Sequence, residues 1–133
     1  MPICEDIWEK TVLEKLSKSG AEIIVAINAS PFTVSKNEER ESVAKLRVNE
    51  TKLPIVYLNR TGGQDELIFD GSSFGLNHDG KIFYNSSEFK EETAQISFQK
   101  TNGKWSGHGN LNNSSSSTAV SYTHLTLPTK RIV

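Results

Sequence analysis

The sequence predicts an α/β fold in which helices cover a largely buried sheet. This prediction rests first on two continuous β-branched runs, at residues 21–28 and 53–59. Each run follows a charged segment whose apolar residues have helical spacing. A third observation is the series of Gly-rich turn signals after residue 60, which is typical of short strands and hairpins. At 133 residues the chain suits one domain with a substantial core.

The first predicted strand is short, and a helix follows it directly. Residues 1–4 are apolar and indicate the end of a strand. Over residues 5–20, apolar side chains recur at helical spacing from Ile7 to Leu16. Acidic residues begin this segment and lysines lie near its end, as the helix dipole favours, and Gly20 is a natural C-terminal stop.

The second strand and helix repeat this order. The run at 21–28 predicts a buried strand, and the loop after it contains Pro31 as a breaker. A second helix is predicted over residues 36–52. The next buried strand, at 53–59, contains Pro54 near its start, where proline is tolerated.

The following segment predicts a loop and a β-hairpin. A Gly-rich loop over residues 60–67 precedes short strands over residues 68–85. The pair Asp79–Gly80 predicts the hairpin turn, because Asp-Gly fits the backbone of a two-residue connection. Helices and strands therefore alternate until the hairpin, as an α/β fold requires.

The character of the sequence changes after residue 98. Residues 99–133 are rich in Asn, Ser, Thr and Gly and contain a four-serine run, so they predict a linker or disordered tail. The domain is therefore expected to occupy residues 1–98. Roughly residues 119–133 resemble the peptide encoded by a sequencing adapter translated in frame, and our hypothesis is that they are an assembly artefact.

The composition argues against several classes of partner. A net charge of −1 and an isoelectric point near 6.3 give no electrostatic reason to expect nucleic acid or an anionic membrane. No apolar run approaches the roughly 20 residues that a membrane helix needs. The single cysteine cannot form an internal disulfide, which favours a reducing, cytoplasmic location.

That cysteine, Cys4, lies where the first predicted strand turns into the first helix. One interpretation is a small buried apolar residue, because inert buried cysteines are common. The other is a reactive thiol, because the dipole and free amides of a helix N-terminus stabilise a thiolate and an oxyanion. The position of Cys4 in the sequence pattern, taken alone, favours a small buried apolar residue.

Three separate motifs carry a family resemblance in their order and spacing. They are PICEDIW at residues 2–8, AEIIVAINASPF at 21–32 with Lys36 after it, and LPIVYLNRTGGQDELIFDGSSF at 53–74. Together they resemble the glutaminase domain of glutamine-dependent NAD synthetases, within the nitrilase or carbon–nitrogen hydrolase superfamily. The resemblance covers about residues 2–85 and implies a partial α-β-β-α sandwich.

The resemblance also implies a reaction and a set of site residues. Cys4 matches the nucleophile, whose thiolate attacks the side-chain carboxamide of L-glutamine to release ammonia and leave a thioester. The backbone N–H of Glu5 is implied to stabilise the oxyanion, and Ser30 and Lys36 match positions that hold glutamine. In the whole enzyme, a second domain uses ATP and Mg to convert nicotinate adenine dinucleotide and this ammonia into NAD.

Ordinary structural roles remain open for two of these residues. Ser30 would also serve to shape the turn before Pro31, and Lys36 would also fit a solvated position at a helix start. No metal site is predicted, because the acidic loop over residues 62–71 lacks calcium-loop spacing and the three histidines are too dispersed for zinc. The resemblance gives no individual roles within that loop.

Parts of the family pattern do not occur in this sequence. The resemblance places the triad glutamate and lysine before the cysteine, where only three residues precede Cys4, and no SGGxDS-type loop of an ATP-using domain follows. Residues 1–98 are therefore expected to be the C-terminal part of a glutaminase domain, inactive alone. In the intact enzyme they would join the synthetase domain within a homo-oligomer.

Two other interpretations stay open from the sequence. The chain would belong to a stand-alone amidase of the same superfamily if no synthetase domain accompanied it. It would otherwise be a catalytically dead remnant that acts only as an interaction module, for which an exposed sheet edge would be the natural contact surface.

Overall fold

The computed structural model describes residues 1–111, the last two by their backbone only. The helical elements of this part are η1 (Cys4–Trp8, a 3₁₀ helix), α1 (Lys10–Lys18) and α2 (Lys36–Thr51). Its strands are β1 (Ile24–Asn28), β2 (Ile55–Asn59), β3 (Thr61–Gln64), β4 (Leu67–Asp70), β5 (Phe74–Leu76), β6 (Ile82–Asn85), β7 (Ala94–Thr101) and β8 (Lys104–Leu111).

The central sheet has four strands in the order β1-β2-β5-β6. β1 and β2 are parallel, with Ile24 opposite Ile55, and the other two pairings are antiparallel. At the other edge of β1, Ile3 makes a single parallel bridge to Ile27. The strand predicted at residues 1–4 is therefore reduced to this one bridge, which sets the path of the chain into Cys4.

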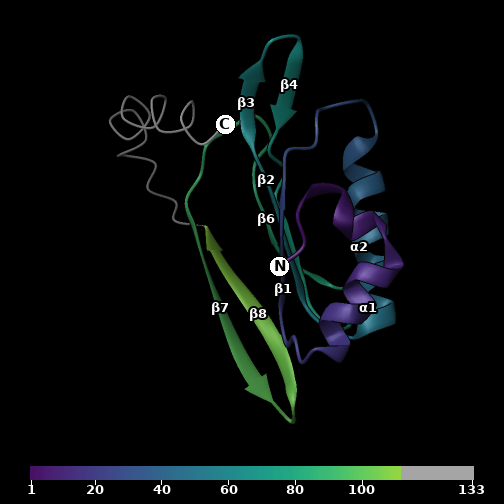
Figure 1. Ribbon diagram of the computed structural model, residues 1–133. Helices are drawn as coiled ribbons and strands as arrows, with labels where there is room; N and C mark the ends of the chain where they lie inside the picture. Colours follow the sequence, from purple (N-terminus) through teal and green to yellow (C-terminus); the bar gives the residue numbers. More distant parts are fainter. Residues whose placement is uncertain (112–133) are drawn as a thin grey trace.

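Both α-helices cover the same face of the central sheet, and the core lies between these two layers (Figure 1). Because strand side chains alternate between faces, every second residue of β1 and β2 points into this core. The core consists of buried apolar side chains, namely Ile7, Leu13, Ile24, Ala26, Ala44, Val48, Ile55, Tyr57, Phe74 and Leu76.

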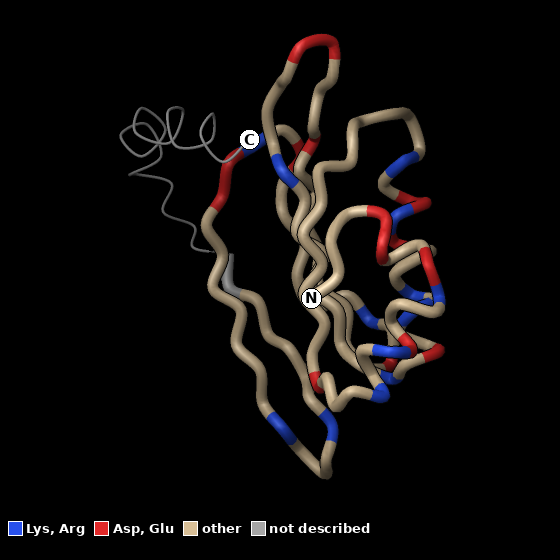
Figure 2. The backbone as a smooth tube through the Cα atoms, viewed as in Figure 1, with Lys and Arg blue, Asp and Glu red and all other residues tan. Residues whose placement is uncertain are grey.

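Charged residues gather on the helices and at the tip of the β3–β4 hairpin, while the central strands carry few (Figure 2). Helix α2 nevertheless buries two arginines, Arg40 and Arg47. They are seven residues apart and therefore lie on the same side of the helix, two turns from each other. Within residues 1–111, no helix is long and apolar enough to cross a membrane.

The prediction of an irregular tail from residue 99 is wrong for residues 99–111. These residues belong to the antiparallel hairpin β7–β8, which lies on the side of the sheet away from the helices (Figure 1). Asn102 and Gly103 form its turn with φ values of +52° and +77°, as a two-residue hairpin turn requires. The predicted domain end at residue 98 is not itself tested, and residues 112–133, with the proposed artefact at 119–133, lie outside the described residues.

Two other segments differ from the predicted elements, and one agrees. The helix expected over residues 5–20 is divided at Glu9, whose φ of −91° and ψ of 114° are extended. The loop expected over residues 60–67 contains β3, which pairs with β4. The hairpin between β5 and β6 is confirmed, and its turn contains Asp79 and Gly80, with Gly80 at a φ of +82°. The connection is longer than the two residues predicted, because the Asn77 amide donates to the Lys81 carbonyl at 2.9 Å.

Candidate active site

Cys4 lies at the junction between its bridging segment and helix η1, as the sequence predicts. Its φ of +53° is in the left-handed region, which residues other than glycine seldom adopt. Two hydrogen bonds hold this turn: the Ile3 amide donates to the Asp6 carboxylate (2.9 Å), and the Asp6 amide donates to the Ile3 carbonyl (3.2 Å). Six other non-glycine residues of the described part also have a positive φ, so the backbone of Cys4 alone does not separate a functional thiol from an inert one.

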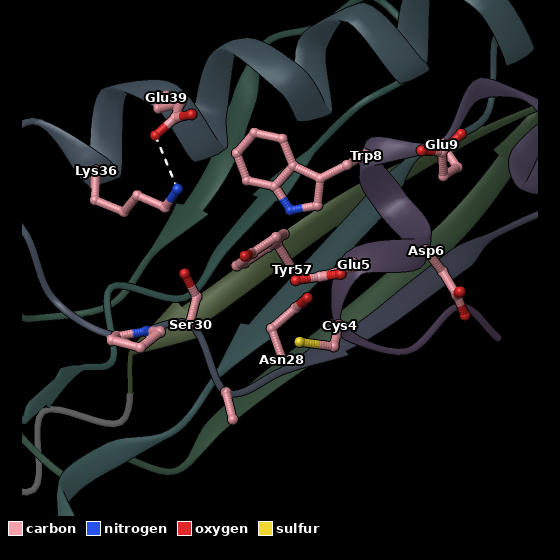
Figure 3. Close-up of a pocket in the computed structure, with 12 residues that line it drawn as sticks. Cys4, Glu5, Asp6, Trp8, Glu9, Asn28, Ser30, Lys36, Glu39 and Tyr57 are labelled. Carbon is pink, nitrogen blue, oxygen red and sulfur yellow. Dashed lines mark ion pairs between the residues drawn. The ribbon is translucent and has the colours of Figure 1, made fainter. Parts of the chain in front are cut away.

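Cys4 contributes to a pocket of about 630 Å³, a size that suits a small molecule. All four residues predicted for the site line this pocket, namely Cys4, Glu5, Ser30 and Lys36. They come from η1, from the loop after β1 and from the start of α2, so the fold brings them together (Figure 3). The remaining lining residues are Asp6, Trp8, Glu9, Asn28, Ala29, Pro31, Glu39 and Tyr57.

Ser30 is held from two sides. The Asn59 side chain, at the end of β2, accepts a hydrogen bond from the Ser30 amide (2.9 Å) and donates one to the Ser30 carbonyl (3.3 Å). Arg40 of α2 donates to the Ser30 hydroxyl (3.1 Å) and to its carbonyl (2.9 Å). Other residues thus fix the turn, while the Ser30 hydroxyl faces the pocket (Figure 3).

Lys36 reaches the pocket between a carboxylate and an aromatic ring. Its ammonium nitrogen lies 2.9 Å from the Glu39 carboxylate and 4.7 Å from the centre of the Trp8 ring. The side chain is only 28% exposed. This environment favours the pocket interpretation of Lys36 over a solvated lysine at a helix start.

Tyr57 of β2 lies in the middle of the pocket view (Figure 3). Its ring stacks on Phe74 with centroids 4.8 Å apart, and within residues 1–111 its buried hydroxyl has no hydrogen-bond partner. Burial raises the pKa of Tyr57, and the nearby Arg40 charge and Ser30 hydroxyl offset this only in part. The phenol is therefore neutral at pH 7 and able to donate a hydrogen bond.

Sequence reasoning missed the aromatic and amide side chains of the pocket. Trp8 falls within the apolar stripe from Ile7 to Leu16 that predicts the first helix, so its position four residues after Cys4 gives no separate signal. Asn28 and Tyr57 belong to apolar runs that predict buried strands, so they did not stand out as site residues. A usable signal was their place near the carboxyl ends of two parallel strands, where ligands bind in open α/β sheets.

None of residues 62–71 lines the pocket, but Asp70 supports it from behind. Asp70 is 1% exposed and accepts two hydrogen bonds from Arg40, at 2.8 and 3.0 Å. Burial acts to raise the pKa of Asp70, but the Arg40 hydrogen bonds and charge help to outweigh it, so the pKa is lowered. Among residues 1–111, no group of three His, Cys, Asp or Glu residues is placed to hold a metal ion.

Comparison with protein families defines the class of this molecule. The chain matches the carbon–nitrogen hydrolase family over residues 1–105. Because the match spans well over half of the chain, the chain belongs to the carbon–nitrogen hydrolase family. This confirms the superfamily expected from the three sequence motifs and the α/β fold class.

Within the family, similar curated proteins are named glutamine-dependent NAD(+) synthetases. The one from Acinetobacter baylyi is 46% identical over 90 residues, covering 68% of this chain and 17% of the relative. The one from Rhodobacter capsulatus is 39% identical over 105 residues, covering 79% of this chain and 19% of the relative. The chain therefore spans less than a fifth of the length of these relatives, and it resembles the synthetase branch that the motifs indicated.

Solved structures agree with this placement. A glutamine-dependent NAD+ synthetase from Acinetobacter baumannii, in complex with ADP, is 40% identical with a TM-score of 0.65, covering 68% of this chain and 17% of that one. A carbon–nitrogen hydrolase from Helicobacter pylori has a TM-score of 0.61 at 23% identity, covering 67% of this chain and 36% of that one. The second likeness shows the fold alone and confirms a partial nitrilase-superfamily fold.

Proposed function

We propose that this chain is part of the glutaminase domain of a glutamine-dependent NAD synthetase. The observation that carries the proposal is that Cys4 lines one pocket of small-molecule size together with Ser30 and Lys36, which lie far from it in the sequence. The 46% identity with a synthetase of that name supports the choice of glutamine over other amides.

The proposed reaction uses Cys4 as the nucleophile. Its thiolate attacks the carbonyl carbon of the glutamine side chain, and the backbone N–H of Glu5 stabilises the oxyanion of the tetrahedral intermediate. The carbon–nitrogen bond then breaks, and the amide nitrogen takes up the proton that the thiol gave up and leaves as ammonia. Water hydrolyses the remaining thioester, which yields glutamate and restores the thiol.

The pocket offers complementary groups for the amino-acid end of glutamine. Lys36 and Ser30 provide an ammonium and a hydroxyl for the α-carboxylate. Glu5, whose side chain points into the pocket in Figure 3, provides a carboxylate for the α-ammonium group. Trp8 and Tyr57 provide apolar surface for the methylene groups.

The remaining parts of the reaction lie with the whole protein. The family's triad glutamate and lysine are assigned to no residue of this chain, so we expect the chain alone not to turn over glutamine. In the whole protein the ammonia would pass to a synthetase domain that uses ATP and magnesium to amidate nicotinate adenine dinucleotide. We propose a cytoplasmic homo-oligomer for that protein, with no nucleic-acid or membrane partner.

A chimera tests this proposal. Residues 1–111, which include the whole β7–β8 hairpin, replace the matching segment of the Acinetobacter baylyi relative, and NAD formation is measured with either glutamine or ammonium as the nitrogen source. We expect the chimera to use both sources. In Cys4→Ala the glutamine-driven rate should fall at least about a thousandfold while the ammonium-driven rate persists. A chimera that works with ammonium but never with glutamine would contradict the proposal.

A further inference from the structure

The contact with Arg40 fixes the direction in which the Ser30 hydroxyl can donate. A guanidinium has donors only, so the Arg40 Nε–H donates to the Ser30 oxygen, 3.1 Å away. A serine hydroxyl has a single hydrogen, which must then point away from Arg40. On that remaining side lie the pocket and the Tyr57 ring (Figure 3).

Arg40 is itself held in one orientation. Its side chain is completely buried and pairs with Asp70 through hydrogen bonds of 2.8 and 3.0 Å. It also donates to the carbonyls of Ser30 and Pro31, at 2.9 and 3.0 Å. A planar guanidinium bound at several points of its fork cannot rotate without breaking several of these bonds at once.

We propose that Arg40 is a positioning residue which, together with Asp70, presents the Ser30 hydroxyl to the ligand as a hydrogen-bond donor. This inference rests on the proposed glutamine site and adds the reason why Ser30 acts there as a donor: the contact with Arg40 occupies its oxygen and leaves its hydrogen for an acceptor of the ligand. Arg40 does not line the pocket, so it acts through Ser30 and not by touching the ligand.

Helix α2 contains a matched control for this inference. Arg47 lies two turns after Arg40, is also buried, and donates to the carbonyls of Ile7 (3.0 Å) and Trp8 (3.2 Å) at the end of η1. It therefore supports the side of the pocket that carries Cys4 rather than the side that carries Ser30. Its effect on ligand binding should be independent of the Ser30 hydroxyl.

A double-mutant cycle on the full 133-residue chain tests the inference. Affinity for L-glutamine is measured as protection of Cys4 from iodoacetamide, followed by intact-mass spectrometry. We expect Ser30→Ala and Arg40→Lys each to weaken protection about tenfold. The double variant should also weaken it about tenfold, because Ser30→Ala removes the donor that Arg40 positions and leaves Arg40 nothing to act through. Combining Ser30→Ala with Arg47→Lys should instead multiply the two single effects.

The outcomes separate this inference from the proposed function. If protection in the double variant Ser30→Ala/Arg40→Lys falls by the product of the two single effects, Arg40 acts independently of Ser30. That result would overturn the inference and leave the proposed glutamine site unaffected. An unaltered chain that glutamine never protects would contradict the site itself and, with it, the inference. Protection in each variant is expressed relative to the alkylation rate of that same variant without glutamine, so a change in the reactivity of the Cys4 thiol is not counted as a change in glutamine binding.

A second measurement does not depend on how Arg40→Lys folds. The Nε–H signal of Arg40 is followed by nuclear magnetic resonance in the unaltered chain and in Ser30→Ala, which is a small substitution. We expect this hydrogen to exchange slowly with water and to exchange at least about tenfold faster once its Ser30 acceptor is removed. An unchanged exchange rate would show that the contact does not hold Ser30 and would overturn the inference.

Discussion

At the scale of single residues, the backbone of Cys4 is shaped by its neighbours. A non-glycine residue in the left-handed region costs about 1 kcal/mol or more. The hydrogen bonds between Ile3 and Asp6, and the bridge from Ile3 to Ile27, hold the turn in spite of this cost. The turn that these contacts hold places Cys4 in the lining of the pocket.

Tyr57 gives a prediction at the same scale. Its buried hydroxyl makes no hydrogen bond within residues 1–111, while its ring packs face to face on Phe74. Tyr57→Phe keeps the ring and removes an unsatisfied polar group. We expect the free energy of unfolding to stay equal or to rise by about 1 kcal/mol, as measured by urea denaturation.

Phe74→Ala is the control for Tyr57→Phe, because it removes the other half of the ring stack. Phe74 is fully buried, so its truncation should lower the free energy of unfolding by about 3–5 kcal/mol. A loss of more than about 1 kcal/mol in Tyr57→Phe would show that the hydroxyl has a stabilising partner and would contradict the prediction.

At the scale of elements, the Arg40–Asp70 pair fastens α2 to the end of β4. Since the pKa of Asp70 is lowered on folding, the folded chain binds its proton less tightly than the unfolded chain does. The pair's contribution is therefore complete above the unfolded pKa, near 4, and is lost as the pH falls through the lower folded pKa.

Asp70→Asn tests this link between the two elements. Leaving Arg40 buried without its carboxylate should lower the free energy of unfolding by about 3–5 kcal/mol at neutral pH, and by less under acid conditions. Urea denaturation over a pH series measures this difference. The exposed Lys45–Glu41 pair on the same helix is the control, and Lys45→Gln should change stability by less than about 0.5 kcal/mol. A pH-independent difference between Asp70→Asn and the unaltered chain would refute the prediction.

The elements also show how far sequence reasoning reaches. β1, β2 and α2 were predictable because their apolar runs and helical periodicity are local signals. The β7–β8 hairpin was missed because the Asn102–Gly103 turn lies in a stretch whose overall composition resembles a linker.

The candidate site was predictable only in part, for a different reason. Cys4, Ser30 and Lys36 were selected by resemblance, since spacing alone favoured an inert cysteine. Arg40 gave no signal at all, because a buried arginine on a charged helix looks the same in sequence as a solvated one. Its partner Asp70 lies thirty residues away, a pairing that only the tertiary structure reveals.

At the scale of the whole molecule, the two faces of the central sheet are covered unequally. On the face under the helices, the inward residues of β1, β2 and β5 are buried, whereas on the other face Val25, Ile27 and Leu58 are 37–47% exposed within the described part of the chain. The α-β-β-α sandwich of the resemblance places a second sheet against such a face. In residues 1–111 only the β7–β8 hairpin approaches it, and mainly over β5 and β6.

The β7–β8 hairpin packs on the central sheet through the Phe83 ring, and a methyl group added at Gly107 should push the two apart. The Phe83 ring lies against both Gly75 of β5 and Gly107 of β8, and a Cβ added to Gly107 would lie 2.5 Å from that ring. Phe98 also packs edge-on against Phe83, at 5.8 Å between centroids, so the ring has little room to move away. Overpacking of this kind costs about 1–3 kcal/mol.

Gly107→Ala should therefore release the hairpin from the sheet without unfolding the core. Hydrogen–deuterium exchange followed by mass spectrometry should show amides of residues 94–111 exchanging about tenfold faster, with β1 and β2 amides nearly unchanged. Gly63→Ala is the matched control, because its added Cβ would meet nothing closer than the Leu67 carbonyl at 3.7 Å. If the amides of residues 94–111 exchanged at the same rate in both variants, the contact between Phe83 and Gly107 would not hold the hairpin on the sheet. Faster exchange in Gly107→Ala alone would establish that the close contact between the Phe83 ring and Gly107 helps to hold the hairpin against the sheet.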